Sequence, residues 1–228
     1  MKKLISIFVL LALSCSSHIT CFASELDKGL STTKVIELEN KTLELRNNTT
    51  GEIDEVYLKE GTKTITTTVV DKSNSVNKNV MTVEGTFYIP EENDPAIATL
   101  GDTESGSKKD PTASVRATLT LEYLSRIDDR GDYWYLLENV SGDWELLDNA
   151  MTLSNKNVAY GCSSSIPPVS QYDMDTSISG DSFDIATNFD TYVCEVADDA
   201  TIGATMQVDI KRTSNTWTFP FSEYLVRN

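Results

Sequence analysis

The chain has almost no histidine, and the only one, His18, lies close to the N-terminus. Charged residues at 1–3 precede an apolar run from Leu4 to Leu13, and Cys21 and Ala23 place small residues at the −3 and −1 positions of a cleavage site. This pattern predicts a signal peptide over 1–23 and not a membrane span. The mature chain would then lack imidazole, which excludes nucleophiles activated by histidine and zinc sites that contain histidine.

Positive charge is also scarce. The chain has 19 Lys and Arg against 35 Asp and Glu, a formal net charge of −16, and the loss of Lys2 and Lys3 with the signal peptide would make it −18. Such a chain repels phosphate backbones and anionic lipid surfaces, so we expect no nucleic-acid partner. The charge favours solubility outside the cell, and calcium held by acidic loops is the one more specific interpretation.

Long apolar runs are missing after residue 24, so the sequence predicts no transmembrane segment there. The segment 221–228 has neither a sorting motif nor an apolar tail. A lipid anchor at Cys15 is an alternative, because Ala12-Leu13-Ser14-Cys15 is similar to a lipobox with its first two positions reversed. We therefore expect a secreted protein, or else a lipoprotein anchored at the cell surface.

Cysteine is limited to four residues, and two of them, Cys15 and Cys21, fall in the signal region. The remaining two, Cys162 and Cys194, predict one disulfide, because exported chains form disulfides in oxidising surroundings. Two buried free thiols are the alternative. A catalytic cysteine is disfavoured, since no histidine is available to form the thiolate.

Aromatic residues are rare in the first half of the mature chain. Residues 25–110 contain three, whereas residues 111–228 contain fourteen. The segment 91–110 is rich in Pro, Gly, Ser and charged residues, which is typical of a linker or a long surface loop. We expect a small β module or extended arm over 24–90 and a compact domain over 111–228.

Alternating apolar residues then predict strands in that domain. Apolar side chains at every second position from Val115 to Tyr123 have the period of a half-buried strand, and turn residues at 128–132 lead into a second strand that starts at Tyr133. Further strands are expected at 150–154, 157–162, 182–186, 191–196, 204–210 and 217–221, a turn at 141–143, weaker strands at 63–70 and 79–89, and a poorly capped helical pattern at 35–45. The fold class is all-β, an antiparallel β-sandwich that is immunoglobulin-like or related.

Several strand and turn motifs of this half resemble a group of exported Gram-positive proteins of uncharacterised function. The motifs are Tyr133-Trp134-Tyr135, Val140-Ser141-Gly142-Asp143-Trp144, Tyr160-Gly161-Cys162, Phe189-Asp190-Thr191-Tyr192-Val193, Gly203-Ala204-Thr205 and Asn215-Thr216-Trp217-Thr218-Phe219. The resemblance covers roughly residues 111–228. It implies export and a sandwich, and it implies no reaction.

Three consecutive aromatic residues, Tyr133, Trp134 and Tyr135, are the candidate ligand-binding residues. Because neighbouring residues of a strand point to opposite faces, at least one of these rings faces away from a core that covers one face. Flat aromatic rings stack on sugar faces and offer a large contact area, so this ring predicts binding of a glycan. Ordinary core packing is the alternative, and it is favoured for Trp144 and Trp217.

Acidic turn residues give a weak calcium candidate. Asp173, Asp175 and Asp181 supply oxygen ligands, but the segment departs from an EF-hand loop, with Ile178 at the glycine position and Asp184 at the final glutamate position. Solvated turn carboxylates are the alternative. The tripeptide Arg130-Gly131-Asp132 is one that adhesion receptors recognise, and a tight turn explains it equally well.

No catalytic residues are identified. The leading hypothesis is a secreted or cell-surface module without catalytic activity that binds a glycan or a protein partner. One alternative is a glycoside hydrolase that uses two carboxylates and no histidine. The other is a structural envelope protein without a ligand.

Overall fold

The computed structural model describes residues 20–23, 31–38, 42–71, 75–89 and 114–227. These residues form two antiparallel β-sheets that pack face to face, so the chain is an all-β sandwich as the sequence predicts. Within these ranges there is no helix, and hence none long and apolar enough to cross a membrane.

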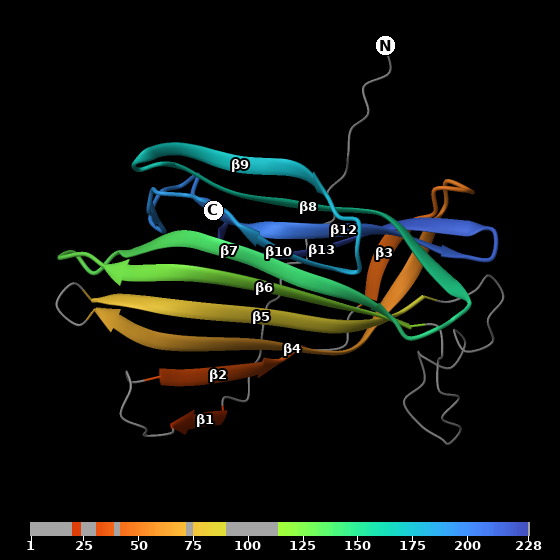
Figure 1. Ribbon diagram of the computed structural model, residues 1–228, viewed down its shortest axis with the longest axis horizontal. Helices are drawn as coiled ribbons and strands as arrows, with labels where there is room; N and C mark the ends of the chain where they lie inside the picture. Colours follow the sequence, from red (N-terminus) through yellow and green to blue (C-terminus); the bar gives the residue numbers. More distant parts are fainter. Residues whose placement is uncertain (1–19, 24–30, 39–41, 72–74, 90–113, 228) are drawn as a thin grey trace, which may run out of the picture.

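The large sheet has the strand order β1-β2-β4-β5-β6-β7-β10, and two short strands extend it, since β3 pairs with β4 and β11 with β7. The small sheet has the order β13-β12-β8-β9 and lies across one face of the large sheet (Figure 1). The strands of the large sheet are β1 (Thr20–Ala23), β2 (Ser31–Glu37), β3 (Thr42–Arg46), β4 (Ile53–Asp71), β5 (Val76–Tyr88), β6 (Ser114–Ile127), β7 (Tyr133–Leu146), β10 (Ser182–Ala186) and β11 (Val193–Cys194). Those of the small sheet are β8 (Met151–Ser165), β9 (Pro168–Ser177), β12 (Thr201–Arg212) and β13 (Asn215–Arg227).

The two-residue period of the sequence decides which side of each sheet is buried. In β6, Val115, Leu119 and Leu121 are fully buried, while the residues between them are half-buried on the opposite side. The same alternation runs along β12. We call the side of each sheet that faces the other sheet its inner face, and the opposite side its outer face.

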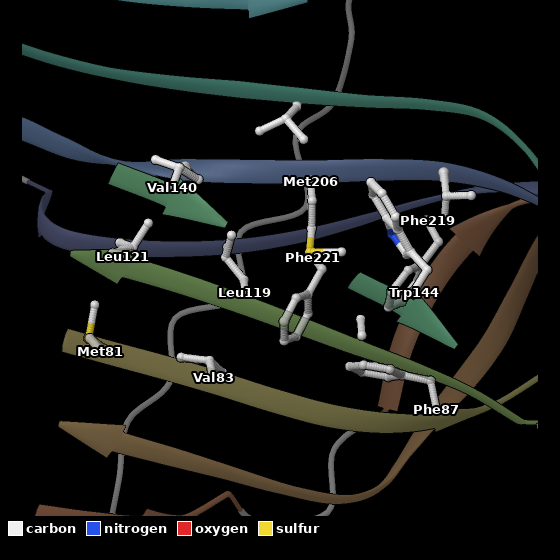
Figure 2. Packing of buried hydrophobic residues seen from close by; sticks show 14 of the residues in the cluster. Met81, Val83, Phe87, Leu119, Leu121, Val140, Trp144, Met206, Phe219 and Phe221 are labelled. Atoms are coloured by element: carbon white, nitrogen blue, oxygen red, sulfur yellow. The ribbon is translucent and has the colours of Figure 1, made fainter. Parts of the chain in front are cut away.

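Aromatic contacts between the two inner faces form the centre of the core (Figure 2). The ring of Phe87 on β5 packs edge-on against Phe219 and Phe221 of β13, with ring centroids 4.7 and 5.7 Å apart. Trp144 of β7 is 2% exposed and packs against Phe183 of β10. The alternative of core packing therefore holds for Trp144 and for Trp217, which is also 2% exposed.

The strands before residue 90 belong to the same sandwich as those after residue 113. β5 pairs with β6 along the whole stretch from Asn77 opposite Ser125 to Tyr88 opposite Ser114. Leu43 and Val56 join the same hydrophobic core as Phe219. This differs from the expected separate module or arm over 24–90, because pairing between distant strands is invisible in a local sequence pattern.

Strand boundaries also differ from the pattern at four places. Residues 141–143 lie inside β7, where Gly142 is needed for close packing: a Cβ there would lie 2.4 Å from the carbonyl oxygen of Thr118. Residues 150–162 form a single strand, β8, with an irregular register around Asn155, whose φ is 48°. Only Val193 and Cys194 of 191–196 are strand, and the helical pattern at 35–45 is wrong, since β2 and β3 lie there.

The predicted disulfide between Cys162 and Cys194 is wrong, because both are free and buried. Cys162 lies on β8 within the core of the sandwich, and its Sγ is 3.8 Å from Oε1 of Gln171. Cys194 pairs with Trp134, while its neighbour Val193 pairs with the inward-facing Tyr135. Directly paired residues share a face, so Cys194 lies on the outer face of the large sheet and its thiol points away from the core that holds Cys162.

The predicted signal peptide and the possible anchor at Cys15 lie mostly outside the described residues. Only Thr20–Ala23 is described, and it forms β1, which pairs with Thr32–Val35 of β2 at the edge of the large sheet. Cleavage after Ala23 would therefore remove this edge strand and leave β2 as the edge.

We predict that the folded protein has two thiols that reagents do not reach. Burial raises the pKa of Cys162 to about 11, so its thiol is protonated and unreactive at neutral pH. A thiol reagent should leave the native chain unmodified and should label both cysteines in denaturant without a reductant. A native mass lower than that of the reduced chain by two hydrogen atoms would contradict this.

We also predict that Phe87→Ala lowers the free energy of unfolding by about 3–5 kcal/mol, the usual cost of removing a buried phenylalanine ring. Phe87 is 1% exposed and contacts both phenylalanines of β13, so a cavity would open between the sheets. Tyr172→Ala is the control, because Tyr172 is 64% exposed and should change stability by less than about 0.5 kcal/mol. Equal urea unfolding curves for the two variants would show that the core is not organised around Phe87.

Candidate functional site

The candidate residues Tyr133, Trp134 and Tyr135 open strand β7 at one end of the sandwich. The register pairs Tyr133 with Ile127 and Tyr135 with Ser125, on the inner face of β6. Trp134 pairs with Arg126 and points to the outer face. The three rings are therefore divided between the two sides of the sheet, as the strand period requires.

The two tyrosines form a stack that runs outward from the core. The rings of Tyr133 and Tyr135 are nearly parallel, 9° apart, with centroids 6.2 Å apart. Tyr135 packs edge-on against the buried Tyr123 at 5.9 Å, whereas Tyr133 is 42% exposed at the open end of the stack. Burial raises the pKa of Tyr123 to about 12, with Glu223 contributing, and burial and Glu195 raise that of Tyr135. All the charge near this stack therefore comes from carboxylates.

One of these carboxylates, Glu195, connects the stack to the loop that follows β11. Its Oε1 accepts a hydrogen bond from the backbone N–H of Tyr133 and its Oε2 one from the hydroxyl of Tyr135, both at 3.3 Å. The backbone N–H of Glu195 in turn donates to the carbonyl oxygen of Tyr133 at 3.0 Å. These bonds hold the loop after β11 beside the start of β7.

On the outer face, the ring of Trp134 is already engaged. The guanidinium carbon of Arg126 lies 5.5 Å from the centroid of Trp134 and 4.4 Å from that of Tyr192, an arrangement typical of cation–π contacts. The indole N–H of Trp134 donates to Oδ2 of Asp128 at 3.1 Å. Trp134 is therefore a structural contact of this face and not an open platform for a sugar ring.

The turn between β6 and β7 is organised by Asp128. Its Oδ1 accepts hydrogen bonds from the backbone N–H groups of Arg130 at 2.9 Å and Asp132 at 3.1 Å. Gly131 has a φ of 90°, a conformation that favours glycine. Partial desolvation raises the pKa of Asp128, but the bonds from Trp134, Asp132 and Arg130 outweigh it and lower the pKa to about 2. The tripeptide 130–132 thus forms the tip of the hairpin, where Arg130 contacts both aspartates.

Four large apolar side chains are exposed at this end of the sandwich, and the sequence pattern had not singled out three of them. They come from the β6–β7 hairpin, the β8–β9 turn and the loop after β11. Bonds between the segments bring them together: Glu195 N–H reaches Tyr133, and the N–H of Cys194 donates to the carbonyl oxygen of Ile166 at 3.4 Å. We call this set the end surface; its members are Ile127 (41% exposed), Tyr133 (42%), Ile166 (48%) and Val196 (51%).

The calcium candidates do not come together. Asp173 and Asp175 lie on the exposed strand β9, where Oδ1 of Asp173 accepts the backbone N–H of Asp175. Asp181 forms an ion pair with Lys156 at 2.5 Å. In the part of the chain that the structure describes, no three His, Cys, Asp or Glu side chains are grouped to hold a metal ion.

One carboxyl group has the raised pKa that a general acid needs. Desolvation raises the pKa of Asp143 above its ordinary value, with a contribution from Glu145, although Thr118 and Arg116 lower it. Asp143 and Glu145 are neighbours on the outer face of β7, and Glu145 is paired with Arg116 at 2.6 Å. The two carboxylates therefore lie side by side on one strand, whereas those of a glycosidase flank the bond that is cleaved.

Comparison of the chain with protein-family models, curated proteins and solved structures found no match in any of the three.

We predict that Asp128 stabilises the fold only above acidic pH. Its folded pKa of about 2 lies below the model value of 3.8, so its contribution is complete above about pH 5 and is lost as the pH falls through 4 to 2. Asp128→Asn should lower the urea midpoint at pH 6, and the difference from the wild type should shrink towards pH 2. A difference that stays constant over this range would mean that the carboxylate charge does not act here.

Proposed function

We propose that the protein is an exported module without catalytic activity that binds a protein partner through its end surface. The observation that carries this proposal is the convergence of Ile127, Tyr133, Ile166 and Val196 from three separate segments, each at least 41% exposed. Exposed apolar groups of this kind are typical of protein interaction sites. Loops at one end of a β-sandwich are a frequent location for such sites.

The chemistry of the end surface favours a protein over a sugar. One face of the Tyr133 ring is stacked on Tyr135, and the other exposed members are branched aliphatic side chains. Tyrosine with aliphatic neighbours is common at the centre of protein interfaces, where charged residues are depleted. Sugar recognition instead needs open ring faces beside hydrogen-bonding groups, and Trp134, the best such ring, is occupied by Arg126 and Asp128.

Hydrogen bonds to carboxylates hold the segments in place before any partner arrives. Asp128 closes the hairpin, Glu195 attaches the loop after β11, and Asp199 accepts bonds from the backbone N–H and hydroxyl of Ser165 at 2.9 and 2.8 Å. A surface ordered in advance loses less conformational entropy on binding. This argues for a binding role over that of a structural envelope protein without a ligand.

The signal-peptide pattern over 1–23 and the resemblance to exported Gram-positive proteins both support a location outside the cell, with the anchor at Cys15 as the alternative form. A hydrolase is the second candidate for the activity, but the adjacent placement of Asp143 and Glu145 gives it little support.

Photo-cross-linking tests the proposal. Benzoylphenylalanine replaces Tyr133 in one variant and Tyr172, the matched exposed tyrosine on β9, in another, and each is irradiated with the extracellular fraction of the cells that produce the chain. We expect a discrete protein adduct from position 133 and none of the same mass from position 172. The partner is then purified and titrated against Tyr133→Ala and Val196→Asp, each of which should weaken binding at least about tenfold, as central interface residues do.

Tyr172→Ala should bind that partner as tightly as the wild type. The same adducts from both positions, or an unchanged dissociation constant for Tyr133→Ala, would overturn the proposal. Displacement of the partner by a soluble polysaccharide would assign the end surface to a glycan instead.

A further inference from the structure

The outer face of the small sheet is a second surface whose composition differs from that of the rest of the chain. Antiparallel register fixes which residues share this face, since directly paired residues point the same way. Four successive rows across the sheet, each taken from β13 towards β9, are Arg227, Thr201, Ser163 and Ser170; Tyr224, Gly203, Gly161 and Tyr172; Ser222, Thr205 and Ala159; and Pro220, Gln207, Asn157 and Ser177.

The second row has a glycine on each central strand and a tyrosine on each flanking strand. A Cβ on Gly161 would lie 2.7 Å from the Cβ of Tyr172, and one on Gly203 would lie 2.5 Å from Cδ1 of Tyr224. Any larger residue at either position would displace its tyrosine. The glycines therefore keep the middle of the face low between two aromatic side chains whose Cα atoms are three strand spacings, or about 14 Å, apart.

The two tyrosines differ in what they offer. Tyr172 is 64% exposed, so its ring is available for contact. Tyr224 lies against Gly203, its hydroxyl is 3.4 Å from that of Thr205, and the guanidinium carbon of Arg227 lies 4.7 Å from its ring centroid. One side of the face thus presents an aromatic ring, and the other presents a guanidinium held in position.

The face is nearly uncharged in a strongly acidic protein. Of the fifteen residues in the four rows, only Arg227 carries a formal charge, whereas the whole chain has a net charge of −16. Seven of the fifteen are Ser or Thr, and Gln207 and Asn157 add amide groups. These side chains both donate and accept hydrogen bonds without the strong desolvation cost of carboxylates.

Nothing in the described strands covers this face. The contacts that join the small sheet to other strands, such as β12 with β6 and β7, or β13 with β3, all run to the large sheet on the inner side. The rows are therefore open to a ligand outside the sandwich.

From these observations we infer that the outer face of the small sheet binds a neutral polysaccharide, whose chain lies across the strands with one sugar ring on Tyr172. Sugar hydroxyls match the rows of Ser, Thr and amide groups, and the apolar face of a sugar ring matches the exposed tyrosine. An anionic polymer is disfavoured by the overall charge. This surface is separate from the end surface, so the inference does not depend on the proposed protein partner.

The test is affinity electrophoresis of the full chain through gels that contain neutral glucan, mannan, xylan or galactan, with polygalacturonate as the anionic comparison. We expect at least one neutral polymer to retard the wild type and polygalacturonate not to do so. Tyr172→Ala should raise the dissociation constant about tenfold, while Tyr172→Phe, which keeps the ring, should stay close to the wild type. Ser170→Glu, which puts a charge in the adjacent row, should weaken binding without disturbing the core.

Tyr133→Ala is the matched control and should bind the polysaccharide normally. The inference is overturned if no neutral polymer retards the chain, if Tyr172→Ala binds as tightly as the wild type, or if Tyr133→Ala loses binding while Tyr172→Ala keeps it. Because the protein partner is tested at Tyr133 and the polysaccharide at Tyr172, either binding activity can fail without the other.

Discussion

The contact of Phe87 with Phe219 and Phe221 is the interaction on which the rest of this structure depends. It joins the middle of the large sheet to β13 of the small one, and it is surrounded by side chains that are almost fully buried. Once these rings interlock, the alternation along each strand decides which residues face outward. The glycine and tyrosine row of the small sheet is outward for this reason, since it is out of phase with the phenylalanines.

Polar groups between the sheets add orientation to this apolar contact. Lys63 of β4 and Glu223 of β13 form an ion pair of 2.5 Å on the inner faces, with side chains 19% and 7% exposed. Nearby in the same sandwich, the indole N–H of Trp217 donates to Oδ2 of Asp54 at 2.6 Å, and Asn47 donates to the same oxygen at 3.1 Å. Buried pairs of this kind contribute little net stability, but an unpaired partner is costly, so they disfavour any other placement of β3 and β4 on β13.

The two surfaces proposed for binding arise from different levels of this architecture. The end surface is built from turns and loops, which carboxylates such as Glu195 and Asp199 hold together. The outer face of the small sheet is built from regular strands, and its shape follows from register alone. A rigid sandwich with a loop surface at one end and an open sheet face can hold two ligands at the same time.

The amino-acid sequence by itself determined the all-β class, the inward positions of β6, β12 and β13, and the turn at 128–132, because each depends on neighbours a few residues apart. It also indicated that Trp134 and its two tyrosine neighbours would be divided between opposite faces. Tertiary structure decided the rest. Whether Cys162 meets Cys194, whether strands before residue 90 share a sheet with those after 113, and which of Tyr133, Trp134 and Tyr135 stays exposed all depend on pairing between distant strands. Such pairing is set by how the whole core packs, and no local pattern records it.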